Sequence, residues 1–271
     1  MKMTPILLIL ACAMISFAQK SDVESVVSGN SDFAVDIYQK IRQESGNIFF
    51  SPYSISTAFA MTYVGARSET EKQMAQALHF PIAQEQLHPA FSELQSKLLS
   101  LQDKFDFKLN IANALWIEKN YDLLFEFLDV NRKHYGANMF HLDFKEDTEN
   151  SRLKINDWVE KKTEGKIIDL LAEGVIKSLT RLVLTNTIYF KAEWEEQFHA
   201  NSTKKADFWL AEEEKAEVQM MQQKSYFGYK ENENLQILEM RYKEEALSMF
   251  VFLPKKIDGL CELESQLSSD T

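Results

Sequence analysis

The chain has 271 residues and a formal net charge of −11, with 45% hydrophobic and 26% charged residues. These values are ordinary for a globular protein with a hydrophobic core, and they exclude fibrous and largely disordered chains. The negative charge also disfavours nucleic acid as a partner, because phosphate backbones would repel it.

The first eighteen residues differ in composition from the rest of the chain. Lys2 gives a positive start, residues 6–17 are almost wholly apolar, and residues 16–18 form a small-residue cleavage pattern. This combination predicts a signal peptide over residues 1–18, cleaved after Ala18. The alternative, a membrane anchor, is disfavoured because the apolar run is shorter than the roughly 20 residues of a spanning helix. We therefore expect a secreted, extracellular protein with no membrane partner.

The cysteines give no disulfide framework. Cys12 lies in the predicted signal peptide, which leaves Cys261 as the sole thiol of the mature chain. Because free cysteines are among the most buried residue types, we interpret Cys261 as a buried or half-buried apolar residue rather than a functional thiol.

Helical periodicity dominates the first half of the chain. Phe33, Ile37 and Ile41 recur at four-residue spacing after the cap-like pair Ser31-Asp32. The same reasoning predicts helices over residues 33–41, 51–65, 68–78, 90–101, 121–135 and 151–162, and a last one over 259–267. A short buried strand is expected at residues 48–50, between the first two helices.

Strand periodicity begins at residue 107 and dominates the second half. Within residues 107–117, every second side chain is apolar except that of Asn113. This pattern predicts a strand with one buried face, and Asn113 lies on that face. Residues 181–190 carry apolar side chains on one face and semi-polar ones on the other, so we expect a central strand covered on both sides. Further strands are predicted at residues 139–144, 217–221, 225–230, 235–242 and 247–253. Helices first and strands later predict an α+β fold, and no linker or repeat divides it into two domains.

No arrangement of residues predicts a catalytic or metal site. The chain has no nucleophile elbow, no phosphate-binding loop and no histidine pair at metal-ligand spacing, so we expect no enzyme, no metal and no cofactor. The sequon Asn201-Ser202-Thr203 is a candidate N-glycosylation site, given the predicted secretion.

Three stretches together resemble the serpins, a family of serine-protease inhibitors that work by refolding. They are Asn47–Ser56 (NIFFSPYSIS), Leu109–Trp116 (LNIANALW) and Asn186–Trp194 (NTIYFKAEW), the last with the family's signature residues Tyr189, Phe190 and Lys191. The resemblance runs from about residue 31 to residue 260, with the stretches in the family's order. One departure is Ala192, where the family usually has glycine.

The resemblance implies an activity based on stored strain. A protease cuts the exposed reactive loop of a serpin and stays attached as an acyl-enzyme, while the loop inserts into the central sheet as a new strand. The expected target is a serine protease, or a cysteine protease as for some members. Ser54, Ser56 and Asn186 fall on the family's shutter, the polar cluster where strands part, and Trp194 falls on the breach, where the loop first enters.

The resemblance also implies that a serpin-like domain over residues 19–271 stops before the reactive loop and the last strands. The bond that a target protease would cut is therefore expected to lie outside this sequence. The hypotheses that remain open are an inhibitor, a non-inhibitory carrier or chaperone, and an inactive fragment. A heparin-type partner is not expected, because residues 89–104 carry only Lys97 and Lys104 as cations.

Overall fold

The computed structural model describes residues 21–44, 46–211 and 213–269. The predicted signal peptide lies outside them. The helices are α1 (Asp22–Ile41), α2 (Pro52–Tyr63), α3 (Ser68–Ala77), α4 (Gln84–Gln102), α5 (Phe125–Tyr135), α6 (Thr148–Lys162) and α7 (Leu260–Gln266). The strands are β1 (Phe107–Glu118), β2 (Asn138–Leu142), β3 (Leu182–Ala192), β4 (Lys204–Ala211), β5 (Glu214–Met220), β6 (Gly228–Glu231), β7 (Leu235–Arg241) and β8 (Ser248–Pro254). The predicted α+β class is confirmed.

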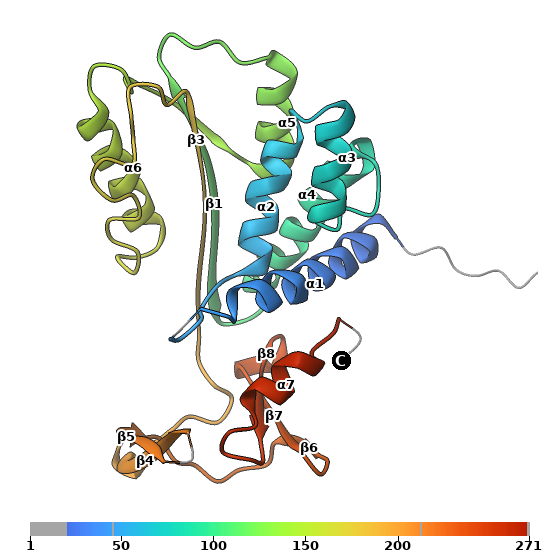
Figure 1. The fold of residues 1–271 in the computed structure, drawn as a ribbon, viewed down its shortest axis with the longest axis vertical. Helices are drawn as coiled ribbons and strands as arrows, with labels where there is room; N and C mark the ends of the chain where they lie inside the picture. Colours follow the sequence, from blue (N-terminus) through green and yellow to red (C-terminus); the bar gives the residue numbers. More distant parts are fainter. Residues whose placement is uncertain (1–20, 45, 212, 270–271) are drawn as a thin grey trace, which may run out of the picture.

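A three-stranded sheet forms the middle of the upper part of the molecule (Figure 1). Its order is β2-β1-β3, with β2 parallel and β3 antiparallel to β1. Helix α6 packs on one face of β1 and β3, whereas α2 and α4 pack on the other. The sheet is therefore a layer between helices, which is a stable way to bury both of its faces.

Alternate residues of β1 enter two separate hydrophobic cores. Leu115 and Ile117 pack with the group of helices that includes α2 and α4. Ala114 and Trp116 pack on the other face with Ile155 of α6. Because successive side chains of a strand point to opposite faces, this alternation fits the two cores. The prediction of a single buried face for this strand is wrong over its second half.

Strand β3 lies at the edge of the sheet within the described part of the chain, not at its centre as predicted. It is hydrogen-bonded along one side, to β1. Both of its faces are nevertheless covered, by α2 and by α6. A strand covered on both faces has the same side-chain pattern whether or not both edges are paired, which is why the pattern suggested a central strand.

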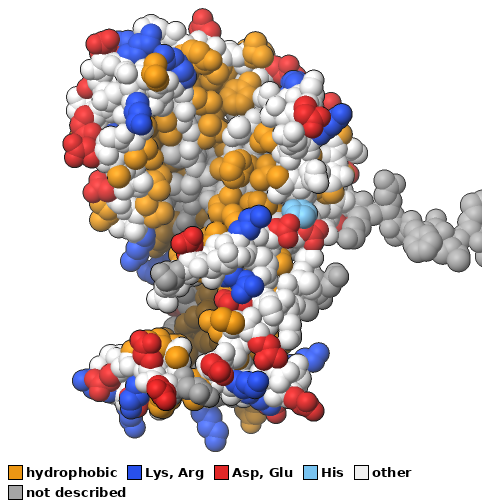
Figure 2. Space-filling model, viewed as in Figure 1, with side chains coloured by type: hydrophobic (Ala, Val, Ile, Leu, Met, Phe, Trp, Pro, Cys, Tyr) orange, Lys and Arg blue, Asp and Glu red, His pale blue; other side chains and the backbone are white. Residues whose placement is uncertain are grey.

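The lower part of the molecule contains the hairpin β4-β5, the sheet β6-β7-β8 and α7 (Figure 1). Charged side chains of both signs cover much of its visible surface (Figure 2). In the upper part, hydrophobic side chains are visible between α6 and α2 (Figure 2). The prediction of one domain over residues 19–271 remains a proposal, supported by the long strands β1 and β3, which run from the upper part toward the lower one.

Several elements differ from the sequence-based predictions in their bounds or existence. The N-cap of α1 is Ser21, ten residues before the cap predicted at Ser31-Asp32, because Ser21 and Glu24 form a reciprocal capping box. Residues 48–50 form no strand in the structure. Strand β4 has no counterpart among the predicted strands.

A buried carboxylate joins the lower part to the upper one. Glu264 of α7 is 8% exposed, and its Oε1 accepts a hydrogen bond of 2.5 Å from the Tyr38 hydroxyl of α1. Arg42 lies 3.6 Å from the other oxygen. Burial and the Glu264 carboxylate raise the pKa of Tyr38 to about 12, so the phenol remains a donor at neutral pH. These contacts link α1 to α7.

Substituting Glu264 by alanine is expected to lower the free energy of unfolding by about 2 kcal/mol, because Tyr38 and Arg42 lose a charged partner in a half-buried site. Urea denaturation would measure it. Glu262→Ala on the same helix is the matched control. Its carboxylate is exposed and 3.7 Å from Lys256, so a change below about 0.5 kcal/mol is expected. Equal effects of the two substitutions would contradict the role assigned to Glu264.

Candidate functional site

Three polar side chains meet where α2 packs against β1 and β3. The Ser54 hydroxyl of α2 donates to Oδ1 of Asn186 in β3. Nδ2 of Asn186 donates to Oδ1 of Asn113 in β1 over 2.6 Å. Asn113 and Asn186 are direct partners in the antiparallel register. We call Ser54, Asn113 and Asn186 the polar cluster.

Local sequence positions Ser54 for this contact. Ser51 is the N-cap of α2, where its hydroxyl accepts from the Ser54 backbone N–H over 3.2 Å, and Pro52 occupies the first turn. A serine cap followed by proline is a strong start signal for a helix. The start of α2 therefore fixes Ser54 one turn into the helix, opposite the middle of β3.

Ser56 does not join the polar cluster. It is fully buried, and its hydroxyl has no hydrogen-bond partner in the part of the chain that the structure describes. Residues two apart on a helix do not face the same side, so Ser54 and Ser56 could not both reach Asn186. The structure thus brings together two of the three residues that the family resemblance grouped, and adds Asn113.

The cluster continues into the helical layer through residues that sequence reasoning missed. Nδ2 of Asn113 donates to the Tyr135 carbonyl over 2.7 Å, and the Tyr135 hydroxyl lies 2.7 Å from Nδ1 of His88 in α4. Burial lowers the pKa of His88 to about 4, with His134 and Arg67 acting in the same direction, so its imidazole is neutral at pH 7. Burial also raises the pKa of Tyr135.

Trp194 lies just beyond the end of β3, in contact with β7. Its ring stacks on that of Tyr242 at 4.5 Å between centroids and 10° between planes, and the two residues form an isolated β-bridge. Phe190 meets Tyr242 edge-on at 5.2 Å and also contacts Phe107 at the start of β1. These rings hold the end of the sheet against the lower part of the molecule.

The other two signature residues lie on β3 beside Phe190. The Tyr189 ring lies 5.8 Å from the Lys108 ammonium, close enough for a cation–π contact. Lys191 is exposed. The position of Tyr189 fits a role in packing, and that of Lys191 fits a role in solvation of the strand end.

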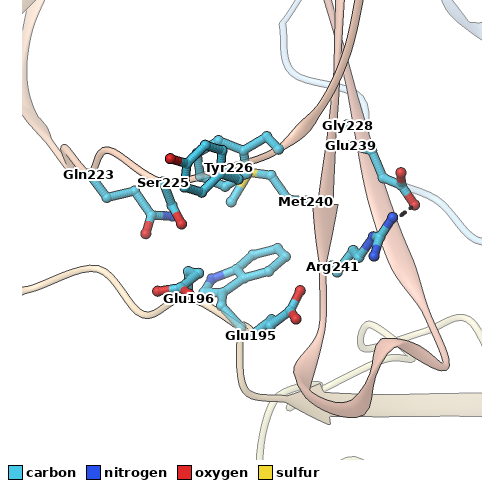
Figure 3. Close-up of a pocket in the computed structure, with 11 residues that line it drawn as sticks. Glu195, Glu196, Gln223, Ser225, Tyr226, Gly228, Glu239, Met240 and Arg241 are labelled. Carbon is cyan, nitrogen blue, oxygen red and sulfur yellow. Dashed lines mark ion pairs between the residues drawn. The ribbon is translucent and has the colours of Figure 1, made fainter.

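A pocket of about 440 Å³ opens beside Trp194. It lies between residues 194–196 after β3, residues 223–228 at the start of β6, and residues 239–241 of β7. Figure 3 shows Gln223, Ser225 and Tyr226 across the pocket from Glu195 and Glu196. The lining contains no histidine or cysteine. The amide, hydroxyl and carboxylate groups of the lining offer a binding surface with hydrogen-bonding groups.

The remaining sequence-based candidates lie elsewhere. Asn201 is exposed in a short 3₁₀ turn before β4. Cys261 is exposed on α7, so the prediction of a buried or half-buried thiol is wrong. Within residues 21–269 as described, no three histidine, cysteine or acidic side chains are placed to hold a metal ion. No helix in the same part of the chain combines the length and apolarity needed to cross a membrane.

We expect the chain to pass through a heparin column at physiological salt. The Lys97 ammonium of α4 lies 2.7 Å from the Glu93 carboxylate, which offsets one of the two cations of residues 89–104. Sulfated polysaccharides need a local cluster of uncompensated positive charge, and α4 provides none. Retention of the protein at about 0.15 M salt would contradict this expectation.

Comparison with known proteins places these features in context. Residues 28–271 match the family model "Serpin (serine protease inhibitor)". The chain is 41% identical over 254 residues to leukocyte elastase inhibitor from Sus scrofa and 39% identical to that from Homo sapiens. Each match covers 91% of this chain, which spans 66% of the length of the relative.

Two solved structures share the fold. Emu (Dromaius novaehollandiae) ovalbumin matches with a TM-score of 0.87 and 30% identity, covering 91% of this chain and 67% of that one. Cleaved kallistatin complexed with heparin matches with a TM-score of 0.83 and 33% identity, covering 92% and 73%.

The comparisons contradict the prediction of secretion. The relatives named above are leukocyte elastase inhibitors, which are serpins of the intracellular type and lack a signal peptide. The prediction rested on the composition of residues 1–18 alone. Glycosylation of Asn201 depended on secretion and loses its support with it.

The family match extends over most of the chain, and the relatives exceed 30% identity. The stretches that suggested the family are also the ones that build the polar cluster and the end of β3. The chain therefore belongs to the serpins, a family of protease inhibitors rather than enzymes.

Proposed function

We propose that the protein inhibits serine proteases by accepting an extended peptide segment as a new strand beside β3. The observation that carries this proposal is the outer edge of β3, which has no strand partner among the described residues. Such an edge presents a row of backbone N–H and C=O groups that can pair with another strand. Strand addition to a sheet edge is an established mode of peptide recognition.

The surroundings of β3 suit it to this role. The strand is 11 residues long, and its two faces are covered by α2 and α6. An inserted strand would therefore bury its side chains between helical layers instead of exposing them to water. This burial supplies the driving force that a refolding inhibitor needs.

The polar cluster supports the proposal because strand insertion requires β3 to move relative to the helices behind it. Ser54 and Asn186 are joined by a hydrogen bond, which can be exchanged for another as the strand moves. An interdigitated apolar contact at this point would leave a cavity when it opened. We propose the shutter role for Ser54 and Asn186, with Asn113 as a third member, and assign Ser56 to the buried face of α2.

Trp194 and its pocket are the proposed entry point. The aromatic stack on Tyr242 holds the end of β3 beside β7, and the pocket provides exposed hydrogen-bonding groups next to it. A segment that enters there could pair with β3 progressively from that end. The Trp194 ring is therefore expected to report insertion through a change in its fluorescence.

The relatives indicate the class of target. They are named leukocyte elastase inhibitors. We therefore propose an elastase-type serine protease as the first target to test. Incubated with leukocyte elastase, the complete protein is expected to form a complex that resists SDS, because the protease remains attached as an ester. Cleavage of the protein without such a complex would identify a substrate and reject the inhibitor.

Strand insertion can be tested on this chain with a synthetic peptide. An 11-residue peptide of alternating threonine and alanine, the length of β3, is expected to protect the β3 amides from hydrogen exchange, as measured by mass spectrometry. The control peptide carries proline at every second position and so lacks half of the N–H donors. Absence of protection, or equal protection by the proline peptide, would reject insertion beside β3.

A further inference from the structure

The turn that joins β7 to β8, residues 242–247, has a strained backbone. Glu244 and Glu245 have φ angles of 66° and 59°, and no other two consecutive non-glycine residues in the described part of the chain have positive φ. In this left-handed region the Cβ atom comes too close to the following carbonyl oxygen, a cost that glycine avoids. Such a conformation persists only where surrounding contacts hold it.

The contacts that hold this turn come from the ends of β1 and β3. The Lys243 N–H donates to the carbonyl of Glu193, which follows β3, over 2.8 Å. The Lys243 ammonium lies 2.9 Å from Oδ2 of Asp106, which precedes β1, and 3.7 Å from Oε2 of Glu193. The Asp106 N–H in turn donates to Oε2 of Glu244 over 3.1 Å. The turn is therefore attached to both long strands of the upper sheet.

Three carboxylates surround the Lys243 ammonium. Its hydrogen bond to Asp106 raises its pKa, and the charges of Glu193 and Glu244 act in the same direction. Without this cation the three carboxylates would repel one another between the turn and the strand ends. All four side chains are exposed, however, so each ion pair stabilises the contact only weakly. The turn thus combines a strained backbone with contacts that open readily.

The turn lies at the end of the sheet where we propose that an extended segment enters. Trp194 forms its β-bridge with Tyr242, and the Glu195 N–H donates to the Arg241 carbonyl over 3.0 Å. Residues 193–195 and 241–243 therefore pair over a short antiparallel stretch. This pairing fixes the end of β3 to the β7–β8 hairpin, so β3 cannot move relative to the hairpin unless the pairing opens.

We propose that the β7–β8 turn is a strained latch, which holds the end of β3 in place and sets the rate at which a segment inserts beside it. This inference rests on the proposed function. The contacts of Lys243 stabilise the closed latch, whereas the left-handed backbone of Glu244 and Glu245 destabilises it. Opening releases this strain, so a relaxed turn would hold β3 more firmly and slow insertion.

Position 245 allows the strain to be changed alone. Glu245→Gly removes the carboxylate and the Cβ, whereas Glu245→Ala removes the carboxylate and keeps the Cβ, so the difference between the two variants measures the strain. The lost ion pair, to Arg241 at 2.7 Å, lies within the hairpin. The 11-residue threonine–alanine peptide is expected to insert about fivefold more slowly into the glycine variant than into the alanine variant. Trp194 fluorescence would follow the insertion.

Position 243 tests the contacts in the opposite direction. Lys243→Met keeps the length of the side chain without its charge, and it is expected to speed insertion about threefold. Lys255→Met is the matched control. It removes an ion pair of 2.8 Å to Glu231 beyond the other end of β8, and the rate should not change.

Hydrogen exchange of the Glu195 amide, measured by NMR without peptide, reports the opening of the latch itself. Relative to Glu245→Ala this exchange should slow in Glu245→Gly, and relative to the original protein it should quicken in Lys243→Met. A merely structural role would lower the urea midpoint of Lys243→Met without speeding insertion, and would overturn the latch. Equal insertion rates in all variants would also overturn it and leave the proposed function intact. If the peptide does not insert into the original protein, the proposed function and the latch are both rejected.

Discussion

Replacing Asn113 by alanine is expected to lower the free energy of unfolding by about 3 kcal/mol. Asn113 is 1% exposed, donates to the Tyr135 carbonyl and accepts from Asn186. Alanine would leave the buried Tyr135 carbonyl and Nδ2 of the half-buried Asn186 without these partners, and it would add a small cavity between the sheet and α5. Urea denaturation followed by circular dichroism would measure the change.

A matched control is available in the same strand. Asn110 is also on β1, opposite Tyr189, and its side chain makes no hydrogen bond within the described residues. Asn110→Ala is expected to cost less than about 1 kcal/mol. If the polar cluster holds β3 in place, Asn113→Ala should also speed amide exchange along β3, whereas Asn110→Ala should not. Equal losses of unfolding free energy in the two variants would show that the hydrogen bonds of Asn113 do not add to the stability of the fold.

The sequence predicted part of the polar cluster because the family resemblance covers two of its three members, Ser54 and Asn186. Ser54 and Asn186 were expected to lie together, and their hydrogen bond places them so. Asn113 was expected on a buried face, but nothing in its strand pattern indicated a partner. A period-2 pattern gives the face of a side chain and not the register of the neighbouring strand. Only the pairing of β1 with β3 reveals that two asparagines lie directly opposite each other.

Tyr135 and His88 could not be found from sequence for a different reason. They lie on separate helices, 47 residues apart, and meet through tertiary packing alone. Each occurs within an ordinary amphipathic pattern, where an isolated polar residue on the buried face gives no hint of its partner. A family resemblance names the residues of a known motif, but it says nothing of the side chains that support them.

The edge position of β3 shows a further limit. Its side-chain pattern indicated correctly that both faces are covered. The edges of a strand, however, are lined by backbone groups, which are nearly the same in every sequence. Whether an edge is paired therefore depends on which other segment reaches it. This is also why the proposed function rests on the arrangement of the sheet and not on any catalytic side chain.

The protein is expected to lose stability in mild acid because of His88. Burial keeps its pKa at about 4 in the folded protein, below the ordinary value of 6.5. Between these two values the unfolded chain binds a proton that the folded chain does not, so the free energy of unfolding falls as the pH decreases. The loss begins near pH 6.5, reaches about 3 kcal/mol near pH 4 and then stops growing. Above pH 6.5, this group makes no contribution to the pH dependence.

Urea midpoints at several pH values between 7.5 and 4 would measure this loss, and His88→Gln provides the control. Glutamine cannot be protonated, so the variant should show a much flatter decline even if it is less stable at pH 7. His134 will contribute a smaller loss in the same direction, because its pKa is also lowered by burial. A second variant, His134→Gln, separates the two. If His88→Gln declined as steeply as the original protein, the acid sensitivity would have to arise from other groups, and the buried, neutral state of His88 would be refuted. A flatter decline would show that burial keeps the imidazole beside Tyr135 neutral in the folded protein.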